Sequence, residues 1–411
     1  MDQIDRFKPT LRAYLVGAYL FSVPAFAYSE TLGLLMIPQI TGALLVAYAL
    51  SDILRGLKIQ IPKEIGLYGL MGLWAVITHY FGVSPNEWRT LSLGTLIKVV
   101  IATLACAQLV KDENDFYTAL KIFVFSILVV FYQNMGDLRY LRIADNIPEM
   151  DRFAGTFTDP NTAAIFSLTV IWASILLLLH SRKGFLSWIW FSIPIVISLL
   201  IIYYSGSKKG LMGLGLFVLF LTKLLYTRQQ SSFYKKGLIL LIASALIIIA
   251  GYFIYSSPFF FRIQQLVYGG SAGDINRSYL ISDAIHVWLR NWKSFFIGVG
   301  YDNFRFVSDL QSNSHSTPLE LLACNGIIGC SLFMGFLILL FRKFVLLYRQ
   351  ALNPELKRIF FSIIIFLFIY SFFMLTHVLH ASRELLPILG GLAAFGQYHL
   401  RLLRRGQVNG A

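Results

Sequence analysis

The sequence predicts an all-α, polytopic membrane protein with about 12 transmembrane helices. Of its 411 residues, 57% are hydrophobic and only 14% are charged, whereas soluble domains have roughly 45 to 50% apolar and 25% charged residues. Apolar runs of about 18 or more residues recur along the whole chain, and each can cross a ~30 Å hydrocarbon core as a helix. We therefore expect residues 1–411 to form a single integral membrane domain.

The predicted spans follow one another closely, except at two long polar segments. The first span follows the polar stretch 1–12 without a small-residue cleavage site, so we expect it to stay in the membrane. The long segments are 133–160 and 257–318. The spans are predicted at 12–29, 31–50, 64–81, 91–110, 116–134, 161–180, 186–204, 210–226, 237–256, 319–341, 359–379 and 385–400.

The basic residues predict the orientation. If the N-terminus is cytoplasmic, about 22 of the 35 Lys and Arg residues face the cytoplasm, mostly in short loops, as the positive-inside rule requires. The opposite orientation fails this test. The net charge of +14 is scattered over helix ends and forms no dense stripe, which argues against nucleic acid as a partner. We expect both termini in the cytoplasm and the lipid bilayer as the immediate partner.

In this orientation the segment 257–318 is a large outer loop that contains short helices. Residues 276–292 carry apolar side chains at helical spacing, with Asn276 or Ser278 placed to cap a helix. The aromatic residues of this stretch suit a helix that lies at the membrane interface. A loop of this length is usually functional or disordered, and its pattern favours function.

Several cations lie on the outer side, against the topogenic preference. Each can be an ordinary solvated charge, but as a set they indicate an anionic ligand. They are Arg139, Arg142, Arg152, Lys208, Lys209, Arg277 and Arg383. Ser205 to Gly210 reads Ser-Gly-Ser-Lys-Lys-Gly, a turn that enters an apolar helix and can bind phosphate through backbone N–H groups and the lysines. Arg277 can offer a bidentate fork to phosphate oxygens.

His315 is the candidate catalytic residue. It lies in Ser-His-Ser-Thr-Pro-Leu-Glu, at the point where the large outer loop meets an apolar helix. Histidine is suited to accept a proton near neutral pH. A single loop histidine is more often structural, but its position beside the outer cations favours catalysis.

These motifs together resemble the O-antigen polymerase and O-antigen ligase family over roughly residues 150–330. The resemblance is carried, in order, by Arg152 to Asn161 (Arg-Phe-Ala-Gly-Thr-Phe-Thr-Asp-Pro-Asn), Ser207-Lys208, Arg277, Ile297 to Gly300, Ser314-His315-Ser316, Glu320 and Gly326 to Gly329. His315 matches the family's loop histidine, Arg277 its large-loop arginine and Arg152 an earlier arginine. Where the family commonly has Ser-Arg, this chain has Ser207-Lys208, which keeps the charge but loses the bidentate fork.

The resemblance implies a glycosyltransferase in the bacterial inner membrane with a periplasmic active site. The donor would be a glycan on undecaprenyl diphosphate, and the acceptor a hydroxyl of a lipid-linked glycan or of lipid A-core. The enzyme would need no metal and no soluble cofactor. A regulator of chain length is a further conceivable partner.

Two readings of the function stay open beside the leading one. The leading reading is a polymerase that extends a lipid-linked glycan, and its nearest alternative is the ligase that moves the finished chain to lipid A-core. A lipid-linked sugar flippase or transporter is a more distant alternative, because transporters tend to show repeats and polar groups at the bilayer midplane. The sequence contains no P-loop, no HExxH and no dinucleotide-binding fingerprint.

Overall fold

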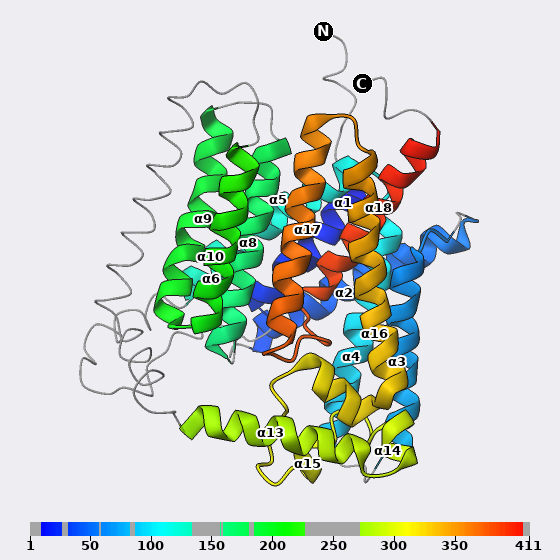
Figure 1. Cartoon of the computed structure of the whole chain (residues 1–411). Coiled ribbons are helices and arrows are strands. Elements are labelled where there is room, and N and C mark those ends of the chain that lie inside the picture. Colours follow the sequence, from blue (N-terminus) through cyan, green and yellow to red (C-terminus); the bar gives the residue numbers. More distant parts are fainter. Residues whose placement is uncertain are drawn as a thin grey trace. The chain divides into compact units, whose positions relative to one another are not determined.

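The computed structural model describes residues 10–26, 32–56, 59–82, 87–133, 157, 159–180, 185–226 and 272–405 (Figure 1). Over these residues the chain is helical, without a strand, as the sequence predicts. The helices are α1 (Leu11–Phe26), α2 (Leu32–Leu54), α3 (Lys63–Tyr80), α4 (Glu87–Leu109), α5 (Glu113–Val124), α6 (Ser126–Gln133), α8 (Pro160–His180), α9 (Phe185–Ser205), α10 (Lys208–Tyr226), α13 (Ala272–Leu289), α14 (Trp292–Ile297), α15 (Phe304–Val307), α16 (Thr317–Gln350), α17 (Pro354–Met374) and α18 (Leu386–Arg404).

Each predicted span that lies in the described residues overlaps with helix, although the span 116–134 is divided between α5 and α6 and the span 359–379 continues past the end of α17 at Met374. The predicted span 237–256 lies outside the described residues. In the described part, 6 helical segments are long and apolar enough to cross a membrane. The chain is therefore an integral membrane protein, while the total of about 12 spans stays a prediction.

The chain divides into two compact units. Unit 1 comprises Met1–Ser126, Asn276–Ile364 and Met374–Ala411, and unit 2 comprises Ile127–Ile275 and Ile365–Phe373. Unit 1 contains His315, Arg277 and Arg383, whereas Lys208 and Lys209 belong to unit 2. The single membrane domain expected from the sequence stays a prediction.

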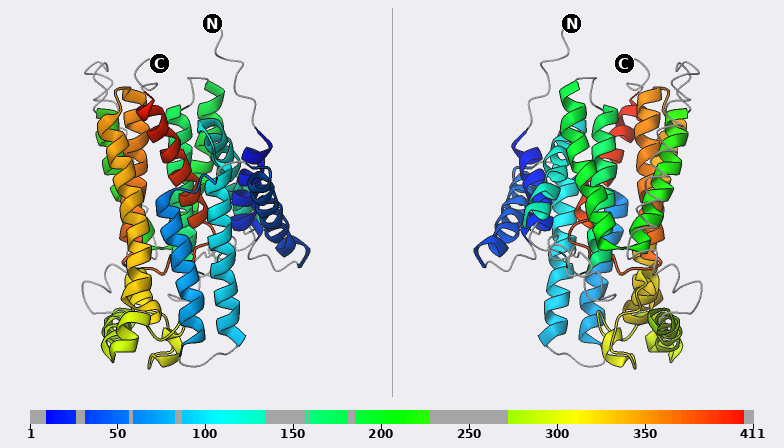
Figure 2. Two further views of the ribbon diagram at one scale, coloured as in Figure 1. Left: turned by 90° about the vertical axis from the view of Figure 1, so that its right-hand side faces the viewer. Right: turned by 90° about the vertical axis from the view of Figure 1, so that its left-hand side faces the viewer.

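Long helices form the body of unit 1. α16 packs along α3, and α18 packs along α4 (Figure 2). The α3–α16 contact is aromatic: the ring of Tyr68 lies 5.4 Å from that of Phe336 and 6.1 Å from that of Phe333. Because Tyr68 is fully buried, its hydroxyl needs a partner, and it donates to the His380 carbonyl at 3.1 Å. This contact fixes the segment between α17 and α18 against α3.

α16 is broken near its start by a glycine. Gly326 has φ 63° and ψ −172°, so the helical backbone is interrupted there. The backbone at the end of α14 passes very close to this point. A Cβ atom on Gly326 would collide with the Phe296 backbone, and a Cβ atom on Gly298 would collide with the Cys324 backbone. The Gly300 N–H donates to the Cys324 carbonyl at 2.9 Å and closes the crossing. The large outer loop is thereby joined to the first turns of α16.

α13 begins earlier than the sequence indicates. It starts at Ala272, so Asn276 and Ser278 lie inside the helix and the prediction that one of them caps it is wrong. Alanine is the best helix former, and the helix extends through it. α13 also ends at Leu289 rather than near residue 292, because Asn291 starts α14 by accepting a hydrogen bond from the Ser294 N–H at 2.8 Å.

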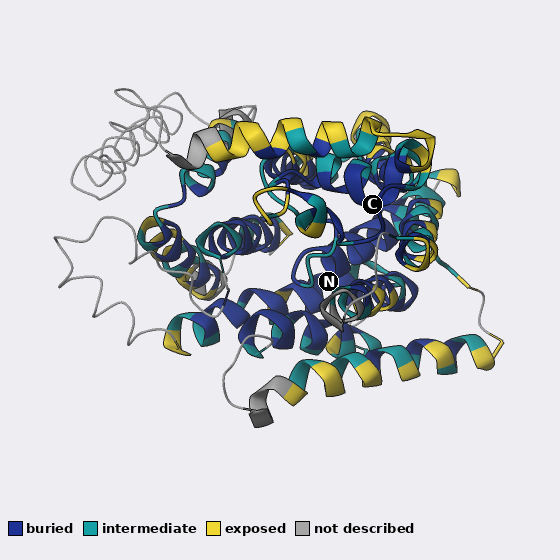
Figure 3. Cartoon of the chain, turned by 90° about the horizontal axis from the view of Figure 1, so that it is seen from below, coloured by how far each residue is buried: buried dark blue, intermediate teal, exposed yellow. Residues whose placement is uncertain are grey.

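α13 has one buried and one exposed side (Figure 3). Leu280 and Ala284 are buried in a cluster with Phe304, Ala323 and Cys324. The opposite side exposes large apolar residues: Tyr279, Ile281, Ile285 and Leu289. Exposed apolar side chains suit a helix at a membrane interface, and this position of α13 stays a prediction.

Candidate active site

His315 ends the loop that precedes α16, and its backbone is strained. Its φ is 52°, in the left-handed region that residues other than glycine rarely adopt. Within the described residues, the other non-glycine residues with positive φ are Asp302 and Gln311, both in the same loop. Such strain costs on the order of 1–3 kcal/mol and persists only where surrounding contacts impose it, often at functional sites. The loop therefore holds His315 in a defined position.

Glu320, in the first turn of α16, supplies one of the contacts that hold this backbone. Its side chain is buried, and its Oε2 accepts a hydrogen bond from the Ser314 backbone N–H at 2.7 Å. The Ser314 hydroxyl in turn donates to the Ser316 carbonyl at 2.9 Å, so both neighbours of His315 are fixed. The His315 N–H donates to the Asn313 Oδ1 at 3.2 Å, and the His315 side chain stays half-buried. The imidazole thus lies on a loop held by a buried carboxylate.

Replacing Glu320 by alanine is expected to reduce the activity that the sequence predicts while the protein still inserts. The Ser314 N–H would lose its acceptor, which costs about 1–3 kcal/mol, and His315 would lose its fixed position. Misplacement of a reacting group by about 1 Å can cost on the order of 100-fold, so we expect kcat to fall ~10- to 100-fold with little change in the KM for the donor.

Glu320→Gln is the matched rescue, because its amide oxygen can still accept the Ser314 N–H, and it should retain most of the activity. Glu355→Ala, at an exposed acid in the first turn of α17, serves as the control and should behave like wild type. Equal losses in Glu320→Ala and Glu320→Gln would show that Glu320 does not act by positioning the loop.

Thr317 joins the His315 loop to the segment between α17 and α18. The Thr317 hydroxyl donates to the His377 carbonyl at 2.7 Å and accepts from the Leu379 N–H at 2.8 Å. Thr317 is fully buried, so these contacts are shielded from water. The segment that carries Arg383 is therefore fixed next to the start of α16.

Arg383 lies four residues beyond this junction. Its side chain is half-buried, and its guanidinium donates to the Thr95 hydroxyl of α4 at 2.9 Å. The contact fixes one part of the guanidinium, whose remaining N–H groups retain the capacity to donate. Its predicted role in binding the donor diphosphate stays a prediction.

The segment after α17 also contributes His380, a second histidine near the start of α16. His380 is buried, and burial lowers its pKa from 6.5 to about 4. A histidine with so low a pKa remains neutral at pH 7 and is a weaker base than an ordinary imidazole. Between the two, the half-buried His315 is better suited to accept a proton.

Arg277 lies on α13, which packs against the helix that follows His315. It is exposed and one helical turn before Leu280, whose side chain packs with Ala323 and Cys324 of α16. The neighbouring Tyr279 donates to the Asp309 carboxylate at 2.7 Å, a bond that raises the pKa of the Tyr279 hydroxyl and links α13 to the His315 loop. Arg277 and His315 therefore belong to one packed assembly of α13, the outer loop and the start of α16.

Lys208 and Lys209 begin α10 of unit 2, immediately after the turn expected from the sequence. Gly206 takes φ 55°, and the Ser207 hydroxyl accepts a hydrogen bond from the Gly210 N–H at 3.1 Å, as an N-cap does. The Ser207 hydroxyl also contacts the Asn161 Oδ1 at 2.9 Å, next to the start of α8. The beginnings of α8 and α10 thus lie side by side, and the macrodipoles of both favour an anion there.

Arg139, Arg142 and Arg152 lie outside the described residues. Sequence reasoning had also not assigned roles to two residues that the structure makes prominent, Glu320 and Thr317. The signal for Glu320 was present, because a carboxylate in the first turn of an apolar membrane helix is costly and therefore usually functional. The role of Thr317 depends on a segment about 60 residues away, which no local pattern reveals.

Comparison with known families adds one result. Residues 193–334 match the family model described as O-antigen ligase. The matched segment includes Lys208, Lys209, Arg277 and His315, and it ends within α16. It confirms the resemblance to the O-antigen polymerase and O-antigen ligase family that the motifs indicate. The comparison with curated proteins finds no match.

Proposed function

We propose that this integral membrane protein, whose residues 193–334 match the O-antigen ligase family, transfers a glycan from undecaprenyl diphosphate to an acceptor hydroxyl on the periplasmic side of the inner membrane. The observation that carries the proposal is His315, half-buried and held at positive φ by the Ser314–Glu320 contact. A strained histidine that is held in position on a loop supports the proposal, because a general base must be positioned within reach of the acceptor proton.

The reaction needs only a few protein groups, because a glycosyl diphosphate is already activated. The acceptor oxygen forms a bond to the anomeric carbon, and the bond from that carbon to the phosphate oxygen breaks. His315 takes the acceptor proton, and undecaprenyl diphosphate leaves with the bonding electron pair. The protein must orient the alcohol, accept its proton and stabilise the charge that grows on the diphosphate.

In this proposal, the diphosphate of the donor is bound by the basic residues predicted on the outer side. Arg277 is exposed on α13, in the same packed assembly as His315, and can give a bidentate contact to phosphate oxygens. Arg383, Arg152, Lys208 and Lys209 are the further candidates. Lys208 and Lys209 lie at the N-terminus of α10, where the backbone N–H groups add to their positive charge. Such a site can bind phosphate oxygens without the bidentate geometry of an arginine.

A polymerase is the form of the reaction that we favour, on the Ser-His-Ser-Thr-Pro-Leu-Glu motif. The ligase is the second candidate, because the family model that matches residues 193–334 is described as O-antigen ligase. Surface glycan from a deletion strain separates them: lipid A capped with a single repeat unit indicates a lost polymerase, while uncapped lipid A with lipid-linked chains retained indicates a lost ligase.

Purified protein is expected to lengthen undecaprenyl-diphosphate-linked repeat units in vitro, releasing one undecaprenyl diphosphate for each linkage formed. The rate should be unchanged by a chelator, because His315 and the cations supply the chemistry. Product length by gel and released lipid by chromatography measure the two quantities. Transport of the labelled lipid across vesicles without chain growth would favour a flippase, and inhibition by chelator would contradict a metal-independent reaction.

A further inference from the structure

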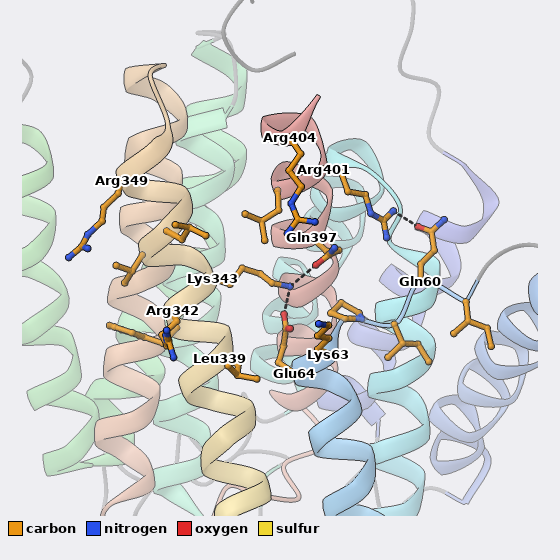
Figure 4. A pocket seen from close by; sticks show the side chains of 17 residues that line it. Gln60, Lys63, Glu64, Leu339, Arg342, Lys343, Arg349, Gln397, Arg401 and Arg404 are labelled. Atoms are coloured by element: carbon orange, nitrogen blue, oxygen red, sulfur yellow. Dashed lines mark hydrogen bonds and ion pairs between the residues drawn. The ribbon is translucent and has the colours of Figure 1, made fainter. Parts of the chain in front are cut away.

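Unit 1 contains a second polar site, a pocket of about 930 Å³ between the start of α3 and the later turns of α16 and α18 (Figure 4). Its volume is in the range of pockets that hold small ligands. Six of its lining residues are basic and one is acidic. The basic residues are Lys63, Arg342, Lys343, Arg349, Arg401 and Arg404, and the acid is Glu64.

The buried charges of this pocket are already organised. Lys343 is 8% exposed and reaches from α16 to form an ion pair with Glu64 and a hydrogen bond of 3.3 Å to the Gln397 Oε1 (Figure 4). Arg401 donates to the Gln60 Oε1 at 2.8 Å. Glu64 therefore balances the buried lysine, and the remaining basic residues give the pocket a large excess of positive charge.

The pocket is far from His315 along the same helix. Beyond the interruption at Gly326, the part of α16 that ends at Lys343 is roughly 25 Å long at about 1.5 Å per residue, which is most of the ~30 Å thickness of the hydrocarbon core. Figure 1 shows α13, α14 and α15 at one end of α16, and its last turns at the other end. The pocket is thus separate from the proposed transfer site and, in the orientation predicted from the sequence, lies on the cytoplasmic side of the membrane.

The lining is amphiphilic. Beside the cations lie apolar side chains from the segment before α3 and from two helices, among them Ile59, Leu339 and Leu346 of α16, and Leu400 of α18. Of these, Ile59, Leu339 and Leu346 are exposed. A small hydrophilic anion would use the cations but leave the apolar wall without a role. A phosphate that carries acyl chains uses both, since basic pockets between membrane helices suit anionic head groups.

We propose that this pocket binds the phosphate head group of an anionic membrane lipid, with the acyl chains against its apolar wall. Arg342 and Arg404, both exposed, contribute to the positive charge that attracts the phosphate, and the Lys343–Glu64 pair supports the base of the site. The bound lipid would stabilise the packing of α3, α16 and α18 at this face.

The test is a titration of the purified full-length protein in neutral detergent with dioleoylphosphatidylglycerol, followed by native mass spectrometry. We expect binding of this lipid and weaker binding of dioleoylphosphatidylcholine, whose head group has no net charge. R342Q/R404Q should weaken the phosphatidylglycerol affinity on the order of 10- to 30-fold. The control R358Q/R405Q also removes two arginines, the half-buried Arg358 of α17 and the exposed Arg405 after α18, both outside the pocket, and should bind like wild type.

Soluble glycerol phosphate distinguishes the source of the phosphate. We expect it to leave lipid binding unchanged at millimolar concentration; displacement of the lipid would assign the pocket to a soluble phosphate and overturn the lipid. Equal affinities of R342Q/R404Q and R358Q/R405Q would overturn the site altogether. Size-exclusion profiles and thermal midpoints show whether the variants are folded. If R342Q/R404Q is not folded, K63Q, at the exposed start of α3, is used to measure the contribution of a lining cation to lipid affinity.

Discussion

His315→Ala is expected to lower the rate of glycan transfer ~100- to 10,000-fold, the usual contribution of a positioned general base. The loss should appear in kcat, because the histidine acts on the acceptor proton and not on the donor diphosphate. His315→Gln should be nearly as inactive, since glutamine can hold the acceptor by a hydrogen bond but cannot take its proton. The measurement is the initial rate of chain growth on undecaprenyl-diphosphate-linked units.

His286→Ala is the matched control, because His286 is an exposed histidine of α13 to which no role is assigned. It should transfer glycan like wild type. Activity of His315→Gln near wild type, with His315→Ala inactive, would assign His315 to positioning the acceptor and remove the general base from the mechanism. Full activity of both variants would contradict the proposed site.

Arg277→Ala is expected to lower transfer ~100- to 1000-fold, the range found when one electrostatic contact to developing charge is removed. Arg277 is exposed on α13 and is not part of the buried cluster around Leu280, so the substitution should leave that packing intact. Arg277→Lys should recover only part of the rate, because lysine keeps the charge without the bidentate fork. Initial rates over a range of donor concentrations provide kcat and kcat/KM.

Arg290→Ala, at the other end of the same helix, is the control for loss of a surface charge. It should leave the rate within about twofold of wild type, because scattered surface charges contribute little. If Arg277→Ala and Arg290→Ala lose equal activity, the effect comes from the general charge of α13, and Arg277 has no specific contact with the diphosphate.

The helices were largely predictable because membrane spans need apolar runs of a set length. The position of His315 directly before α16 was predictable too, since the polar loop changes abruptly into an apolar run at Pro318. The length of α16 was not: it continues to Gln350, past the predicted end at 341. Arg342 and Lys343 mark the end of the apolar run, but both are good helix formers and continue the helix.

Other features depend on contacts between distant residues and leave only weak local signals. The interruption of α16 was missed because the run 319–341 looks continuous in hydropathy, although Asn325-Gly326 is a common turn dipeptide. The early start of α13 was missed because Asn276 is a good capping residue by type, yet tertiary packing of Leu280 and Ala284 favoured a longer helix. The contact between Glu320 and Ser314 spans six residues, which differs from the usual capping-box spacing.

The crossing of two backbones at Gly298 and Gly326 affects how genetic screens of this protein should be interpreted. Neither position tolerates a side chain, so substitutions there would abolish surface glycan as completely as changes at His315. The cause would differ, because the chain could no longer fold around the crossing. A mutational survey scored by phenotype alone would thus group scaffold and chemistry together, and only the abundance of each variant in the membrane would separate them.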